Sequence, residues 1–274
     1  MIASRIHAVV TAGIENPSLI SRWRANPELL RGQGIEPSMV DLDALWKFAG
    51  LTVKVRHNAL RDELPASFRL LTLLGLEIEL FTAYAIDTAS RGARFAPTTE
   101  GRTLDLLIFL EGWLDHEFRA HGLLWDLIRH ERALGRLART APAVGSSPDL
   151  WRSGEPPPTP AFDIVPRIRG EVALHEMTSD PKLTAAALQD DAPDLSVIPR
   201  IESRVCYWRT DSGPEVVTLS LDQLGFAALS LVDGVRTAAE LQRALGGGRR
   251  PSPALLRVLG ELQTIGVIVL RRPR

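Results

Sequence analysis

A segment rich in proline, glycine and serine occupies residues 140–160 and separates two parts of the chain with different sequence patterns. It contains the run Gly154-Glu155-Pro156-Pro157-Pro158-Thr159-Pro160. Proline lacks the backbone N–H that helices and sheets use, and clustered prolines favour an extended chain. We therefore predict a linker at 140–160, a first domain at 1–139 and a second domain at 161–274. The 274 residues suffice for two domains with separate cores.

The first domain is predicted to be a helical bundle. Asn16-Pro17 and Asn26-Pro27 each pair an N-cap residue with a proline that suits the first helical turn. Apolar residues recur at helical spacing over residues 41–58, 65–84 and 99–139, the last with Gly122 as a point for a break. Residues 65–84 are apolar nearly all round, which is typical of a central helix.

The second domain is predicted to contain both strands and helices, which places the whole chain in the α+β class. Strand patterns occur at residues 170–177, 201–209, 215–219 and 267–270, with a turn at Asp211-Ser212-Gly213-Pro214. Helical patterns with capping residues occur at 180–189, 220–231, 237–245 and 252–265. Residues 200–272 thus follow the order β-β-α-α-α-β, which indicates a winged-helix-like module preceded by an extra strand.

Two runs within this module resemble a known family. Residues 231–241 read Leu231-Val232-Asp233-Gly234-Val235-Arg236-Thr237-Ala238-Ala239-Glu240-Leu241, and residues 259–268 carry Leu259, Leu262 and Ile265-Gly266-Val267-Ile268. They resemble the L-x-D-G-x-x-T-x-x-E-L core and the last helix and strand of PqqD-like peptide-recognition domains. Such domains bind the leader of a ribosomally made precursor peptide and hand it to a modifying enzyme. The resemblance covers the C-terminal quarter, and many DNA-binding winged helices share D-G-x-x-T-x-x-E-L.

Charge helps to choose between peptide and DNA. The formal net charge is −1 and the pI is about 6.6, so no overall positive field would hold a polyanion. The third helix of the module offers one cation, Arg257, beside one acid, Glu261, which is little for reading a DNA groove. We therefore expect no nucleic acid partner. Arg249-Arg250 and the tail Arg271-Arg272-Pro273-Arg274 keep a DNA-binding regulator as an alternative.

Peptide recognition of this kind predicts where the binding site lies. An extended peptide adds to an exposed sheet edge through backbone hydrogen bonds, and adjoining pockets fix its register. We place the groove between the edge strand and the third helix of the module. The predicted peptide-binding residues are Val217, Leu219, Leu255, Leu259 and Leu262.

A second resemblance lies in the first domain. The run Lys54-Val55-Arg56-His57-Asn58-Ala59-Leu60-Arg61-Asp62-Glu63-Leu64-Pro65-Ala66-Ser67-Phe68-Arg69-Leu70-Leu71 resembles the N-terminal signature of the non-metal partner subunits of multinuclear non-haem iron oxidases, of the methanobactin and thiaglutamate type. Their architecture of helical domain, linker and recognition-like fold is similar to that of nearly the whole chain. The resemblance implies a heterodimer with a TIM-barrel iron enzyme that oxidatively rearranges residues of a precursor peptide. The long proline-rich linker departs from the pattern and leaves the subfamily open.

His57, Asn58 and Arg61 in this run are the candidate partner contacts. Helical spacing puts His57 and Arg61 on one face, just before Pro65. A polar trio that leads into an apolar helix forms either a buried hydrogen-bond network or a face for a partner, and both readings stay open.

The ionisable residues match no known catalytic or metal-binding motif. The sequence has six histidines but no H-E-x-x-H, C-x-x-C or G-x-S-x-G. Asp126 and His130 share a helix face near His116, and Glu77 or Glu79 would have to complete a metal site, so a helical metalloenzyme stays an alternative. We expect no catalytic residue, metal or cofactor on this chain. The single cysteine, Cys206, is expected to be a small buried residue in a strand.

The sequence also predicts a cytoplasmic protein without membrane contact. It has neither a run of about eighteen apolar residues nor an apolar signal core, and a lone cysteine fits a reducing compartment. We interpret the chain as a non-catalytic accessory subunit whose partners are a leader peptide and a TIM-barrel multinuclear iron oxidase. The alternatives are a winged-helix DNA-binding regulator, a helical metalloenzyme and a structural scaffold.

Overall fold

The computed structural model describes residues 2–115, 117–140, 159–190, 192–209, 215–248 and 252–272. The chain combines helices with small antiparallel sheets, so the predicted α+β class is confirmed. It divides into two compact units, Met1–Ile128 and Arg129–Arg274. The division falls inside helix α9 (Arg119–Arg139), so the end of this helix groups with the second unit and not with the bundle predicted at 1–139. Most of the predicted linker lies outside the described residues.

The first unit contains helices and no strand among its described residues. These are α1 (Ile2–Glu15), α2 (Pro17–Ala25), α3 (Glu28–Arg31), the 3-10 helix η1 (Pro37–Met39), α4 (Leu42–Arg56), α5 (Leu60–Glu63), α6 (Pro65–Leu73), α7 (Glu77–Ser90), α8 (Thr99–Trp113) and the start of α9. The Asn16 side chain accepts a hydrogen bond from the backbone N–H of Ser18 at the start of α2, as the sequence predicts.

Two of the long helices predicted in this unit are divided, which corrects the prediction. The stretch at 65–84 becomes α6 and α7, because Gly75 takes a left-handed conformation (φ 69°) between them. The stretch at 99–139 becomes α8 and α9, with α8 ending at Trp113 and α9 beginning at Arg119, so the break is not near Gly122. There the Asp115 side chain accepts a hydrogen bond from the backbone N–H of Glu117, a local turn that competes with the helix.

Helix α4 packs against α7 and α2 at the centre of the first unit. Gly50 allows the close approach of α4 to α7. A Cβ atom there would lie 2.7 Å from the carbonyl oxygen of Ile78 and would overlap the Thr82 side chain. Buried apolar residues of α1 to α4 form an adjoining core: Val9, Ile20, Trp23, Leu30, Ile35, Val40, Leu45 and Ala49.

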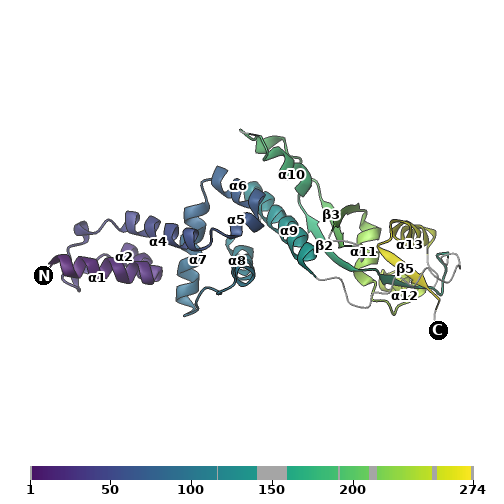
Figure 1. Cartoon of the computed structure of the whole chain (residues 1–274), viewed down its shortest axis with the longest axis horizontal. Helices are drawn as coiled ribbons and strands as arrows, with labels where there is room; N and C mark the ends of the chain where they lie inside the picture. The colour runs from purple at the N-terminus through teal and green to yellow at the C-terminus, as the bar shows by residue number, and fades with distance from the viewer. Residues whose placement is uncertain are drawn as a thin grey trace. The chain divides into compact units, whose positions relative to one another are not determined.

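The second unit holds two antiparallel sheets in its described residues (Figure 1). Strands β2 (Glu171–Met177), β3 (Ser203–Arg209) and β4 (Val216–Leu221) form one sheet in the order β2-β3-β4, and β1 (Val165–Ile168) pairs with β5 (Ile268–Arg271). The helices are α10 (Pro181–Ala187), the 3-10 helix η3 (Leu195–Val197), α11 (Gln223–Leu231), α12 (Ala238–Ala244) and α13 (Pro253–Ile265). The sequence analysis missed β1, because Pro166 interrupts its strand pattern.

The predicted strands and helices of this unit occur with shifted ends. The largest shift is at Ser220, which was predicted to open a helix. Instead Ser220 and Leu221 extend β4, and α11 begins only after Asp222, whose side chain accepts a hydrogen bond of 2.6 Å from the backbone N–H of Gly225. The turn predicted at 211–214 lies outside the described residues.

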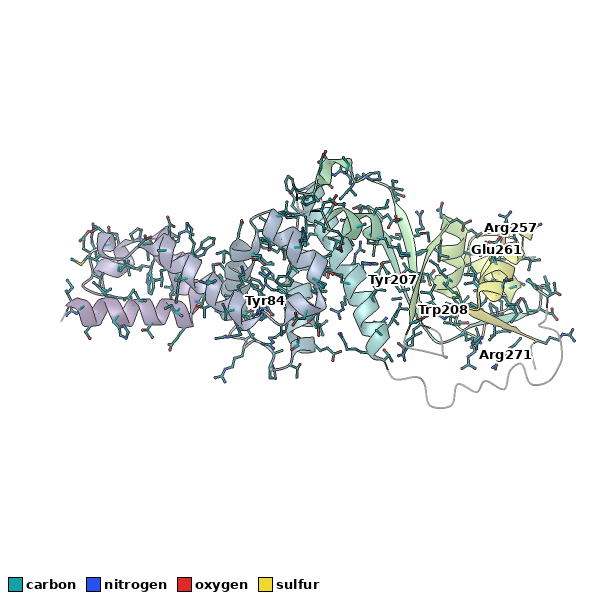
Figure 2. All side chains as sticks on the ribbon, turned by 45° about the horizontal axis from the view of Figure 1, so that its top comes forward. Tyr84, Tyr207, Trp208, Arg257, Glu261 and Arg271 are labelled. Carbon is teal, nitrogen blue, oxygen red and sulfur yellow. The ribbon has the colours of Figure 1, made fainter. Side chains whose placement is uncertain are left out.

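The two faces of the three-stranded sheet pack against different helices, because side chains alternate along each strand. On one face, Trp208 and Leu219 belong to a core shared with α11, α12 and α13. On the other face, Val205 and Tyr207 pack against the last turns of α9. Tyr207 and Trp208, neighbours in β3, can be found in Figure 2. Among the described residues, β3 is the central strand of this sheet, and β2 and β4 form its two edges.

Candidate functional site

The D-G-x-x-T-x-x-E-L motif forms a tight turn and a helix start. The Asp233 carboxylate accepts hydrogen bonds of 2.9 Å from the backbone N–H groups of Arg236 and Val235, and these bonds lower the pKa of Asp233. Gly234 takes a φ of 78°, which favours glycine. Thr237 and Glu240 form a reciprocal capping box at the start of α12. The polar residues of the motif thus have a local structural role between α11 and α12.

The five predicted peptide-binding residues meet in one core of the second unit. Leu255, Leu259 and Leu262 of α13 have exposed fractions of 0%, 0% and 3%, so a peptide cannot reach them in this conformation. Val217 and Leu219 of β4 are partly buried against the same core. The structure therefore brings the five residues together, and only the two in β4, Val217 and Leu219, are partly accessible.

Strand β4 forms one edge of its sheet, since within the described residues it pairs with β3 alone. Such an edge presents backbone N–H and C=O groups that can pair with another strand. The exposed side chain of Lys182, from α10, lies against this strand, with its Nζ 3.5 Å from the carbonyl oxygen of Thr218. Lysines are common at sheet edges, where their charge discourages indiscriminate pairing. The β4 edge thus has backbone groups available for a further strand, and the cation Lys182 lies beside it.

A buried polar cluster joins α9 to the opposite face of the sheet. His130 Nδ1 lies 2.8 Å from the Tyr207 hydroxyl oxygen, and the ring of His175 meets the ring of Tyr207 edge-on. Burial lowers the pKa of His130 and of His175 to about 4, with smaller effects from the positive charges of Lys182 on His130 and Arg129 on His175. Both imidazoles are therefore neutral at pH 7. The sequence did not predict this cluster, because its members come from separate elements.

His57, a predicted partner contact, is fully buried in the first unit. Its Nδ1 lies 2.8 Å from the carbonyl oxygen of Val53, and its ring is surrounded by Phe81, Tyr84 and Phe95. Burial lowers the pKa of His57, so the ring is neutral and its Nδ1–H donates to Val53. This geometry corresponds to the buried-network reading and closes His57 to a partner in this conformation.

Arg61, the second predicted contact, forms an ion pair inside the same unit. The mostly buried Glu77 carboxylate accepts from both Arg61 and Lys54, and the Arg61 guanidinium also lies over the ring of Phe68. Glu77, which the sequence analysis named as a possible metal ligand, therefore forms ion pairs with two cations. Asn58, the third predicted contact, is exposed.

An exposed apolar row leads along α4 to Asn58. Phe48, Leu51 and Val55 are exposed by 51%, 43% and 66%, and helical spacing places them on one face. The opposite face of α4 is buried against α7 and α2. Exposed apolar patches on a protein surface often mark interaction sites. The sequence analysis missed this row, because helical periodicity alone does not tell which face of a helix the fold covers.

The outer face of α13 carries a shallow pocket of about 630 Å³. Its lining is Thr159, Pro160, Arg257, Gly260, Glu261, Gln263, Thr264 and Ile265. Arg257 and Glu261 form an exposed ion pair with an N–O distance of 3.7 Å, so the single cation noted on this helix is matched by an acid (Figure 2). The pocket lies on the side of α13 away from its buried leucines.

Cys206 is fully buried, as predicted, and burial raises the pKa of its thiol to about 12. Among the described residues, no group of three or more His, Cys, Asp or Glu side chains could hold a metal ion. His116, which the sequence offered as a ligand, lies outside them. No helix in the described part of the chain is long and apolar enough to cross a bilayer.

No protein-family model and no curated protein matches this sequence. The two resemblances drawn from its motifs therefore stay predictions.

Proposed function

We propose that this chain is a non-catalytic accessory subunit that binds the leader of a ribosomally made precursor peptide. It presents the peptide to a TIM-barrel multinuclear iron oxidase, which holds the metal and carries out the chemistry. In this proposal, the second domain predicted at 161–274 is a winged-helix-like recognition module, and the first unit contacts the enzyme.

The edge strand β4, beside a three-helix core, is the observation that carries the proposal. From β3 onward the elements follow the order β3, β4, α11, α12, α13, β5. A peptide that adds to β4 would gain backbone hydrogen bonds along six residues, Val216–Leu221. The partly buried side chains of Val217 and Leu219 would widen the contact on the core side. The buried leucines of α13 would support this surface from beneath without touching the peptide.

The apolar row of α4 supports a partner surface on the first unit. Phe48, Leu51 and Val55 form an exposed stripe that ends at Asn58, one of the residues in the run similar to the partner subunits. Arg61 and His57 would then act indirectly, by holding the end of α4 and the start of α5 in place. The enzyme would cover this stripe in the heterodimer.

A matched pair of proline variants in the full chain tests the peptide site. Val217 in β4 and Val172 in β2 both pair with Trp208, from opposite sides of β3. Proline fits poorly in a paired strand, because it lacks the backbone donor and its ring crowds the neighbouring chain, so Val217→Pro should disturb β4 and weaken binding of the leader at least about tenfold from a micromolar Kd. Val172→Pro should leave the affinity within about twofold of wild type.

Titration calorimetry with the leader of a short peptide encoded beside this gene measures both affinities, after circular dichroism has shown that each variant is folded. Equal affinities for the two variants would contradict a peptide-binding site at β4. Salt-dependent binding of duplex DNA, with no binding of the leader, would favour the DNA-binding alternative instead.

A further inference from the structure

Lys182 places a positive charge on one side of the β4 edge. Its Nζ lies 3.5 Å from the Thr218 carbonyl oxygen. Its charge also acts on His130, which is hydrogen-bonded to Tyr207, the cross-strand neighbour of Thr218. Thr218 lies opposite Tyr207 on the face of the sheet that packs against α9, so Lys182 lies beside a strand residue of that face. Asp180 also acts on His130, but its carboxylate caps α10, where it accepts from the backbone N–H of Lys182.

No acidic side chain in the described part of the chain forms an ion pair with Lys182. Within these residues, the ammonium group donates to the Thr218 carbonyl and takes part in no ion pair. By comparison, Arg204 on the neighbouring strand β3 pairs with Glu176. A peptide strand laid against β4 would therefore meet a cation that can turn toward a new acceptor.

The other side of the same edge is apolar. Val217 and Leu219 flank Thr218 in sequence and point to the core of α11, α12 and α13. Residues of an added strand alternate as those of β4 do. The residues opposite Val217 and Leu219 would therefore lie on the apolar side, and the residue opposite Thr218 would lie beside Lys182.

We infer that the peptide held at β4 has an apolar–acidic–apolar sequence and that Lys182 selects its acidic residue. This inference rests on the function proposed above, and it names the class of peptide that the edge accepts. An acidic side chain opposite Thr218 would replace the carbonyl as the partner of the Lys182 ammonium group. The apolar residues on either side of it would extend the half-buried surface of Val217 and Leu219.

The test uses the full chain and two synthetic peptides of about ten residues, the length of a long strand. Both carry valine and leucine around one central residue, which is aspartate in the first peptide and lysine in the second. At low salt the wild type should bind the aspartate peptide roughly threefold to tenfold more tightly, as expected for a partly exposed charge pair. Lys182→Glu should reverse this preference, and Lys182→Met, which keeps the apolar stem, should abolish it. Lys47→Glu, at an exposed lysine of α4, is the matched control and should leave the preference unchanged.

Hydrogen exchange of β4 separates the two levels of the proposal. If both peptides protect the amides of Val216–Leu221 but Lys182→Glu does not change the preference, the inference about Lys182 is overturned and the peptide site stands. If neither peptide binds or protects β4, both are overturned. If Lys47→Glu changes the preference between the two peptides as strongly as Lys182→Glu does, the preference reflects overall charge, and the inference is also overturned.

Discussion

Burial keeps His57, His130 and His175 neutral, and their contacts depend on that form. The pKa of each is lowered chiefly by the loss of hydration, which penalises the charged imidazolium. His130 contacts the Tyr207 hydroxyl, and His57 donates to a backbone carbonyl near the end of α4. These side chains therefore contribute to packing at neutral pH and oppose it when they are protonated.

Acid should destabilise the second unit through His130 and His175. An unfolded histidine has a pKa of about 6.5, whereas the folded pKa of both is about 4. Between these values the unfolded chain binds protons that the folded chain does not, so their contribution to stability is complete above about pH 6.5 and is lost as the pH falls toward 4. His130→Gln should therefore lose less unfolding free energy between pH 7 and pH 4.5 than the wild type.

Urea unfolding at several pH values, followed by tryptophan fluorescence, measures this difference. His7→Gln, at an exposed position of α1, is the control and should follow the wild type. The assignment is wrong if His130→Gln and wild type lose the same unfolding free energy over this pH range.

Helices and strands with local signals at their ends follow the sequence closely. The capping box of Thr237 and Glu240 and the left-handed Gly266 (φ 94°) that ends α13 lie where the pattern predicts. Predictions failed at residues whose type occurs in two kinds of local structure. Gly75 lies within an apolar helical pattern, yet its conformation ends α6. Ser220 resembles a helix start, yet the cross-strand pairing with Val205 keeps it in β4.

Two glycines in helices should respond oppositely to alanine. Alanine in a helix is normally more stable than glycine by about 1 kcal/mol, and Gly112 of α8 has nothing within 4 Å of an added Cβ. Gly112→Ala should therefore stabilise the first unit by up to about 1 kcal/mol. At Gly50 an added Cβ would overlap α7, so Gly50→Ala should destabilise the unit by about 1–3 kcal/mol.

Chemical denaturation of the two variants beside the wild type measures both changes. A Gly50→Ala variant as stable as Gly112→Ala would mean that α4 and α7 do not approach as closely as the structure describes.

Across the whole molecule, the sequence predicts which residues form apolar faces better than it predicts which features lie on the surface. Helical periodicity identifies Leu255, Leu259 and Leu262 as one apolar face, but it cannot tell a buried core from the wall of a groove. The contact of His130 with Tyr207 joins residues 77 positions apart, and no local pattern marks it. The edge position of β4 is likewise a property of the assembled sheet. The proposed peptide site at β4 therefore depends on a feature that local sequence patterns do not encode.

In the proposed complex, a leader peptide pairs with β4 while the enzyme contacts the first unit. Hydrogen exchange with mass spectrometry on the full chain, with and without the leader of a short peptide encoded beside its gene, measures where the leader binds. We expect slower exchange in Val216–Leu221 and unchanged exchange in Leu42–Arg56 when the leader is added. Leader binding that slows exchange in α4 and leaves β4 unchanged, or no binding at all, would contradict this proposal.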